Sequence, residues 1–177
     1  MSSGFRLLSV CVLLGGLALA SCENVPGSAM GPRPGQAVVN AFAPASIRVH
    51  PLTHLDRDVD GQPMILLHLE LRDSWGDSCK AVGTVVVELY RPSQGVTSGL
   101  ERQELVWEID LSDLEANRAL FDPATRTYRF QLTDLPKWVT VDPSDVGSRR
   151  LRLSAVLTTT GVSGEQAVYD DSYVLRY

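Results

Sequence analysis

Apolar and polar side chains alternate along most of the chain from residue 46 onward. In an extended strand, successive side chains point to opposite faces, so each alternating run predicts a strand with one buried and one solvent-facing side. The clearest runs cover residues 64–72, 104–111, 127–132 and 149–158, and shorter candidates cover residues 47–50, 83–90 and 167–177. In the last of these, Asp170 and Asp171 are the candidate break.

Seven such segments follow one another without the intervening helices that a parallel sheet requires. We therefore expect an all-β chain folded as an antiparallel β-sandwich, with immunoglobulin-like topology first and C2-like or transthyretin-like sandwiches as alternatives. Gly161 and Gly164 predict a hairpin turn between the last two strands. Ser112 and Glu115 have the spacing of a capping box, which predicts one short helical crossover over residues 116–120.

The outward faces of the predicted strands differ in charge. The strand at 149–158 presents Arg150 and Arg152, whereas the strand at 104–111 is acidic. In an immunoglobulin-like order we expect Glu88 beside the two arginines and the acidic stripe at a sheet edge, where charge discourages aggregation. A docking stripe for a basic partner is the alternative. The acidic stripe consists of Glu104, Glu108 and Asp110.

The N-terminal segment has a different pattern. Residues 7–20 form an apolar run after a short start that carries one positive charge, at Arg6. The run is shorter than the roughly 20 residues that a membrane-spanning helix needs. It has the character of the apolar region of a secretory signal, which is removed from the mature protein.

The apolar run ends in Leu19-Ala20-Ser21-Cys22. This tetrapeptide resembles the lipobox of bacterial lipoproteins, in which Leu and two small residues precede the cysteine that becomes the mature N-terminus. The resemblance covers only these first 22 residues. It implies that residues 1–21 are a signal peptide, that Cys22 is lipidated, and that the protein is anchored to a membrane of the cell envelope. Glu23 in place of Asp favours the outer membrane. An ordinary signal-peptidase site with an incidental Cys22, or an uncleaved anchor, are the alternatives.

Between the lipobox and the first predicted strand, residues 22–45 contain four prolines and three glycines. This composition predicts a flexible tether with a root-mean-square span of about 25 Å. The folded domain is expected to cover residues 46–177, a length that can bury a core without disulfides. Within the tether, the apolar segment 37–42 is a candidate for docking on the domain or on a partner.

Charge and cysteine content narrow the classes of function. The chain has 21 Asp and Glu against 16 Lys and Arg, a net charge of −5, which argues against sequence-independent nucleic-acid binding. Of the three cysteines, Cys11 and Cys22 lie in the N-terminal segment, so neither a disulfide framework nor a multi-cysteine zinc site is expected. Cys79 is expected to be a buried small hydrophobe rather than a reactive thiol. No cofactor is indicated.

The most suggestive chemical motif is the run from Asp56 to Gly61. Its carboxylates at alternate positions match the first half of a calcium loop. Leu67 occupies the position where an EF-hand needs a bidentate Glu, so the second half does not match. A solvated turn is the alternative. The metal candidates are Asp56, Asp58 and Asp60; Asp73 and Asp77 lie about 25 Å away at the other end of the predicted strand.

The histidines and tryptophans give weaker signals. His50 and His54 would lie about 13 Å apart on a strand, too far to share a metal ion, and His68 is expected on the polar surface. Trp107 fits the core pattern. We expect Trp75 and Trp138 to lie in loops, where an aromatic side chain either anchors the loop or offers a contact surface.

No nucleophile, base or phosphate-binding motif stands out. The expected function is therefore that of an envelope lipoprotein whose β-sandwich is a non-enzymatic binding or structural module for a protein or a polysaccharide. A calcium-dependent carbohydrate-binding or hydrolytic domain that uses the Asp56 loop is the alternative.

Overall fold

The computed structural model describes residues 40–92, 101–139, 149–161 and 164–177. The expected signal peptide, Cys22 and most of the expected tether lie outside these residues. The chain divides into two units, and the second covers Val38–Tyr177. The folded domain therefore begins before Ser46, and residues 40–45 belong to it. The backbone N–H of Ala45 donates to the carbonyl of Arg72 over 2.7 Å, which fixes this segment to the sandwich.

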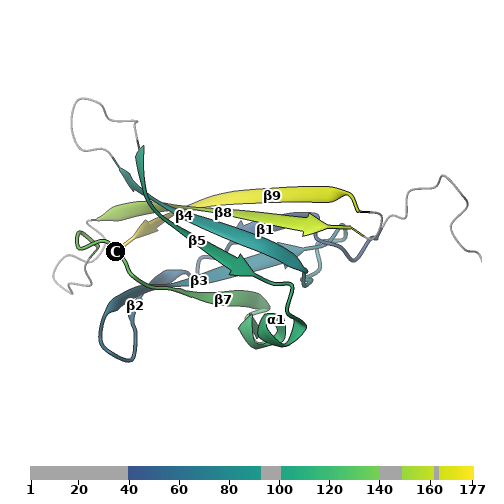
Figure 1. Cartoon of the computed structure of the whole chain (residues 1–177), viewed down its shortest axis with the longest axis horizontal. Helices are drawn as coiled ribbons and strands as arrows, with labels where there is room; N and C mark the ends of the chain where they lie inside the picture. The colour runs from purple at the N-terminus through teal and green to yellow at the C-terminus, as the bar shows by residue number, and fades with distance from the viewer. Residues whose placement is uncertain (1–39, 93–100, 140–148, 162–163) are drawn as a thin grey trace, which may run out of the picture. The chain divides into compact units, whose positions relative to one another are not determined.

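The strands form two antiparallel sheets (Figure 1). Sheet A has the order β1-β3-β7-β6, with β2 also pairing with β3, and sheet B has the order β5-β4-β8-β9. The expected all-β antiparallel sandwich is confirmed. Sheet A contains β1 (Ser46–Val49), β2 (His54–Arg57), β3 (Pro63–Arg72), β6 (Phe121–Asp122) and β7 (Thr127–Leu132); sheet B contains β4 (Gly83–Pro92), β5 (Glu101–Asp110), β8 (Arg150–Thr160) and β9 (Gln166–Arg176).

This strand order is that of an immunoglobulin-like domain. In that fold, strands A-B-E-D form one sheet and strands C-F-G the other, to which a C′ strand can be added beside C. Lettering the strands in chain order, with β2 left out, gives A-B-E-D for sheet A and C′-C-F-G for sheet B. Of the three sandwich types expected from the sequence, the first therefore describes the observed order.

Two short strands were not expected. β2 continues the edge begun by β1, because both pair with β3, and the connection at residues 50–53 interrupts the edge at Pro51. β6 has only two residues and pairs with the start of β7. Alternation needs several residues to be visible, which is why neither strand could be recognised in the sequence.

β9 runs without the break considered at Asp170 and Asp171. It is an edge strand of sheet B, and Asp171 lies on its inward side. The Asp171 carboxylate accepts a hydrogen bond of 2.7 Å from the backbone N–H of Val49 on β1. An inward-pointing charge on an edge strand is therefore used to join the two sheets at this edge.

The core lies between the sheets and is built from the apolar positions that the alternation predicted, such as Leu67, Val87 and Leu153. β3 is an exception to simple alternation, because its outward side is buried as well. His68, expected on the surface, is only 6% exposed. Its Nδ1 lies 2.9 Å from the hydroxyl of Thr127 on the neighbouring strand β7. A central strand is covered by the long side chains of its neighbours, and a single sequence does not reveal which strand is central.

Sheet B places the charged outward residues partly as expected. β5 is an edge strand, which confirms the edge position of the acidic stripe. β4 and β8 are paired, but the register sets Ser154, not an arginine, opposite Glu88. Arg152 instead pairs with Glu101 of β5. The sequence pattern predicts that these two strands pair but does not define their register. The observed register differs by two residues from the one that would set Arg152 opposite Glu88.

The helical crossover is confirmed as α1 (Leu114–Leu120), which lies between β5 of sheet B and β6 of sheet A. Its N-cap is Asp113 rather than the expected Ser112: the Asp113 carboxylate accepts from the N–H groups of Glu115 and Ala116. The helix is held to the core by Asn117, whose amide donates to the carbonyls of Ala81 and Leu111 over 2.7 and 2.8 Å.

Candidate functional site

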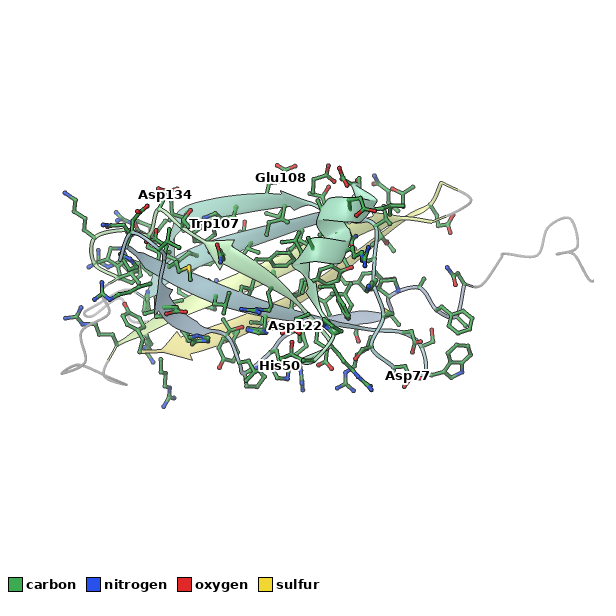
Figure 2. The ribbon with its side chains drawn as sticks, turned by 90° about the horizontal axis from the view of Figure 1, so that it is seen from below. His50, Asp77, Trp107, Glu108, Asp122 and Asp134 are labelled. Atoms are coloured by element: carbon green, nitrogen blue, oxygen red, sulfur yellow. The ribbon has the colours of Figure 1, made fainter. Side chains whose placement is uncertain are left out.

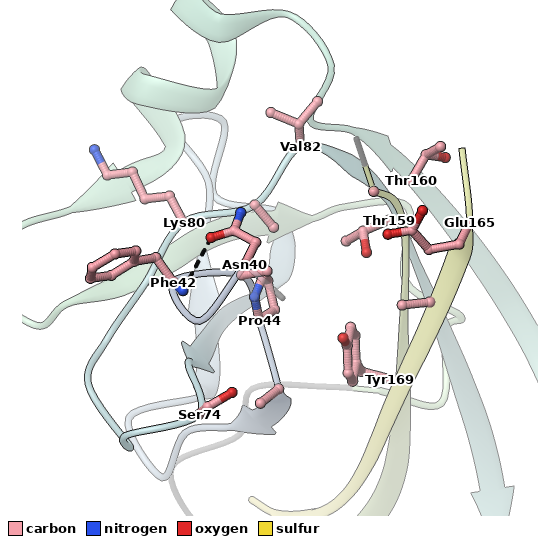
Figure 3. Close-up of a pocket in the computed structure, with 15 residues that line it drawn as sticks. Asn40, Phe42, Pro44, Ser74, Lys80, Val82, Thr159, Thr160, Glu165 and Tyr169 are labelled. Carbon is pink, nitrogen blue, oxygen red and sulfur yellow. Dashed lines mark hydrogen bonds between the residues drawn. The ribbon is translucent and has the colours of Figure 1, made fainter. Parts of the chain in front are cut away.

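A groove opens at the end of the sandwich where residues 40–45 enter the domain. Three segments line it: residues 40–45, the β3–β4 connection, and the β8–β9 hairpin (Figure 3). Its volume is about 650 Å³, which is within the usual range for ligand sites. We call it the tether-end groove, and its principal lining residues are Asn40, Phe42, Pro44, Ser74, Lys80, Val82, Thr159, Thr160, Glu165 and Tyr169.

An exposed aromatic pair stands at the rim of the tether-end groove. Phe42 is 72% exposed and Trp75 is 63% exposed, and their ring centroids lie 5.1 Å apart in an edge-to-face arrangement. Val82, which lines the groove, is also exposed. Each ring thus covers part of the other, and most of their apolar surface still faces solvent. Adjacent exposed aromatic side chains of this kind typically mark contact surfaces rather than folding elements.

Short-range hydrogen bonds of the backbone order the two turns that carry these rings. The Asn40 side chain accepts from the N–H of Phe42 over 3.2 Å, and the N–H of Ala43 donates to the Asn40 carbonyl, which closes a turn (Figure 3). Trp75 lies in the turn that follows β3, where its N–H donates to the buried carboxylate of Asp73 over 2.9 Å. The aromatic pair is therefore presented by two ordered turns.

Polar side chains line both sides of the groove, because Asn40, Ser74 and Lys80 lie across from the hairpin together with apolar residues. Thr159, Thr160 and Glu165 come from the β8–β9 hairpin, whereas Pro44 and Val82 lie across from them (Figure 3). The ammonium of Lys80 lies 4.4 Å from the centroid of the Phe121 ring, a cation–π contact. The titratable side chains that line the groove are those of Lys80, Glu165 and Tyr169. This set can bind a polar chain with an apolar side by hydrogen bonds and packing.

The residues predicted to bind calcium form a hairpin turn. The Asp58 carboxylate accepts from the N–H groups of Asp60 and Gln62 over 2.9 and 2.8 Å, and Gly61 has a φ of +76°. Asp56 accepts from the N–H of Arg57. In the described part of the chain, no three His, Cys, Asp or Glu side chains are grouped so as to hold a metal ion. The geometry is that of the solvated turn, the alternative considered for this loop.

The turn at Asp73 repeats this geometry at the other end of β3. Asp73 accepts from the N–H groups of Trp75 and Asp77 over 2.9 and 3.0 Å, and Gly76 has a φ of +87°. Asp77 and Asp134 mark the two ends of the sandwich in Figure 2, with Asp77 at the tether end. The Asp-x-x-Gly pattern shared by residues 58–61 and 73–76 is a sequence signal for both turns.

A second hollow, of about 610 Å³, lies between α1 and the outer side of sheet A. Its charged residues are Arg129 and Asp122, which form an ion pair of 3.7 Å across it. Backbone hydrogen bonding at Ala124 is the main cause that lowers the Asp122 pKa. Because its two charges are satisfied by each other, we regard this hollow as a weaker site than the tether-end groove.

The remaining candidate residues have structural roles. Cys79 is partly buried against the core, and burial, reinforced by the nearby Asp73 carboxylate, raises its thiol pKa to about 11. Trp107 packs on the core and donates to the carbonyl of Thr133 over 3.1 Å (Figure 2). Trp138 anchors its loop to the core beneath the guanidinium of Arg91. Of the two tryptophans expected in loops, only Trp75 offers a free contact surface.

Comparison with known proteins adds no family to this picture. No model of a protein family matches the chain. The curated proteins likewise give no match to the chain. None of the helices in the described ranges is long and apolar enough to cross a membrane.

Proposed function

We propose that the protein is a lipid-anchored lipoprotein of the cell envelope, on the outer membrane, whose β-sandwich is a non-enzymatic binding module. The lipobox-like sequence ending at Cys22 supports the anchor, since two or three acyl chains hold a protein durably on a membrane whereas one chain does so only marginally. Residues between Cys22 and Asn40 then connect the anchor to the end of the sandwich that carries the tether-end groove.

The observation that carries the binding role is the exposed Phe42–Trp75 pair at the rim of that groove. The domain core is complete without these two rings, because both lie outside the buried cluster between the sheets. Tryptophan in a partly recessed position is among the side chains that contribute most to protein interfaces. The hairpin side of the groove supplies the hydroxyl groups of Thr159 and Thr160 for hydrogen bonds to the same ligand.

We infer that the groove receives a segment of another envelope protein or a polysaccharide. A flexible tether allows the domain to meet a partner at varied distances from the membrane, and its root-mean-square span is about 25 Å. The groove's lining can hydrogen-bond an extended chain along the hairpin while the aromatic pair packs on its apolar side. The expected ligand is thus an extended chain that carries hydrogen-bonding groups and an apolar surface.

Co-purification of the full chain from envelope membranes tests this role. The variant Phe42→Ser/Trp75→Ser removes the aromatic pair and is expected to lose its specific co-purifying component, while the wild-type chain retains it. Val59→Ser is the matched control, because Val59 is a fully exposed apolar residue in the β2–β3 turn at the opposite end of the sandwich. Equal recovery of the same component by the double variant would reject the groove as the binding site.

A further inference from the structure

The charges of sheet B are separated along the direction of its strands. In the half nearer the tether-end groove, the described strands carry acidic residues and no lysine or arginine. In the other half, arginines outnumber glutamates. The acidic half contains Glu108, Asp110 and Asp170 on its outward side and Asp171 on its inward side; the basic half, from the row of Glu88 to the far end, contains Arg91, Arg102, Arg150, Arg152 and Arg176 with Glu88, Glu101 and Glu104.

Two pairs of arginines lie directly opposite each other across neighbouring strands of the basic half. The register sets Arg91 opposite Arg102 and Arg150 opposite Arg176. Like charges directly opposite each other in a sheet are destabilising. The first pair is compensated, because Arg102 forms an ion pair of 2.6 Å with Glu104 and Arg91 stacks on Trp138.

The second pair is not compensated by an acidic side chain among the described residues. Arg150 and Arg176 are both exposed, and they lie on the outward side of sheet B together with Arg152. Arg152 lies over the ring of Tyr90, 4.0 Å from its centroid, which is a cation–π contact. Its pairing with Glu101 neutralises one of the three charges. We call the surface formed by Arg150, Arg152, Arg176 and Tyr90 the arginine face.

We propose that the arginine face binds a linear anionic polysaccharide that carries carboxylate groups. Guanidinium groups bind carboxylates in bidentate geometry, and two guanidiniums side by side, with no acidic partner in the described part of the chain, match successive charges on one polymer. A single exposed ion pair contributes little, so a flat, open surface of this kind gains affinity only from a ligand that offers several anions at once. The acidic half of the same sheet repels such a polymer and confines it to the far end.

This proposal concerns the end of the domain opposite the tether-end groove, and it does not depend on the lipid anchor or on the groove's ligand. Together with an anchor at Cys22, it would make the domain a bridge between a membrane and an anionic polymer. The net charge of the chain is −5, which opposes a general affinity for polyanions. The local arrangement of arginines must therefore supply the binding.

Isothermal titration of the purified full chain with polygalacturonate, and with neutral dextran of similar length, tests the proposal. We expect heat of binding with polygalacturonate alone, weakening as ionic strength rises because the contacts are charge-based. Arg150→Ser/Arg176→Ser is expected to lower the affinity about 10- to 30-fold, the loss expected for two cationic contacts with an anionic surface. Arg118→Ser/Arg126→Ser makes the same change in net charge at the tether end, outside the groove, and is expected to have much less effect.

Thermal unfolding separates a lost contact from a damaged fold. Removing one or both members of the Arg150–Arg176 pair relieves repulsion, so Arg176→Ser and the double variant should unfold at a temperature no lower than that of the wild-type chain. Equal loss of affinity in both double variants would overturn the proposal, since general charge would then account for binding. Absence of binding to polygalacturonate, or equal affinity for duplex DNA of similar charge, would overturn it as well.

Discussion

His68 illustrates how a polar residue can be buried on the outer side of a sheet. Thr53 holds its backbone and Thr127 its ring: the backbone N–H of His68 donates to the Thr53 hydroxyl, and Nδ1 lies within hydrogen-bond distance of the Thr127 hydroxyl. Burial is the main cause that lowers the His68 pKa, and the positive charge of Arg129 and the nearby His54 and His50 act in the same direction. The Asp122 carboxylate opposes them.

From this pKa we expect stability that depends on pH below neutrality. The unfolded chain protonates His68 near its ordinary pKa of 6.5, whereas the folded chain does so only at lower pH. The free energy of unfolding should therefore fall as pH drops below about 6.5, by at most about 1.4 kcal/mol per pH unit from this group. Denaturant unfolding across this range should show a smaller pH dependence for His68→Asn than for the wild-type chain. Equal slopes for the variant and the wild-type chain would contradict this account.

Cys79 is expected to be an unreactive thiol. With a pKa of about 11, its thiolate fraction near pH 8 is lower by about two orders of magnitude than that of an ordinary cysteine. In a Cys11→Ser/Cys22→Ser chain, which retains only this thiol, labelling by a disulfide reagent should be slow in buffer and fast in denaturant. Cys79→Ser should lower the free energy of unfolding by about 1 kcal/mol. Labelling at the same rate in both conditions would show that the thiol is exposed and free to react.

At the scale of elements, the two Asp-x-x-Gly turns fix both ends of β3. Their backbone hydrogen bonds match pair by pair: in each, the Asp N–H donates to the carbonyl four residues later over 2.9 Å, and the Gly N–H donates to the Asp carbonyl over 3.0 Å. They differ in burial, because Asp73 is buried whereas Asp58 is partly exposed. The Asp73 turn also presents Trp75 to the tether-end groove.

The difference in burial predicts that the two aspartates contribute unequally to the free energy of unfolding. Asp73→Ala leaves two N–H groups without an acceptor near the core, so we expect a loss of about 1 to 3 kcal/mol in the free energy of unfolding. Asp58→Ala should cost about 1 kcal/mol or less, because water can replace the carboxylate there. Chemical denaturation measures both. With calcium added, we expect no shift in the wild-type unfolding midpoint; a shift that Asp60→Asn removes would support the calcium-binding alternative.

The helix α1 depends on Asn117 for its attachment. Asn117 is buried, its amide nitrogen donates to two carbonyls, and its oxygen accepts from the hydroxyl of Tyr128 over 2.8 Å. Asn117→Ala removes all three hydrogen bonds and should lower the free energy of unfolding by about 2 to 4 kcal/mol. Tyr128→Phe removes the bond to Asn117 and the one that its hydroxyl accepts from the Ala81 N–H over 3.2 Å, and it should cost less because both amide donor bonds of Asn117 remain. A double-mutant cycle measured by denaturation should give a coupling energy well above zero; simple additivity would show that the network does not act as a unit.

At the scale of the whole molecule, the long strands could be predicted and the site could not. Alternation over residues such as Ile65–Leu71 defines a strand without reference to anything else in the chain. The tether-end groove, in contrast, joins Phe42, Trp75 and Glu165, which lie far apart in sequence and meet only because β1, β3 and the β8–β9 hairpin end on the same side. Strand order and register decide which distant residues come together, and a single sequence defines neither of them.

The same reasoning explains the errors at smaller scale. His68 was assigned to the surface because alternation separates two faces but does not say whether the outer face is covered by neighbouring strands. Glu88 was placed beside Arg150 and Arg152 because the pairing of β4 with β8 was expected without its register. In both cases the strand was predicted and its environment was not.

The lipid anchor is the central claim, because it decides where every surface of the domain can act. Metabolic labelling with a clickable fatty acid, followed by membrane fractionation, tests it most directly. We predict that the wild-type chain and the control Cys79→Ala are labelled and sediment with membranes, whereas Cys22→Ala is unlabelled and stays as an unprocessed or soluble precursor. A labelled Cys22→Ala chain, or an unlabelled wild-type chain, would contradict the assignment of Cys22 as the lipidated residue.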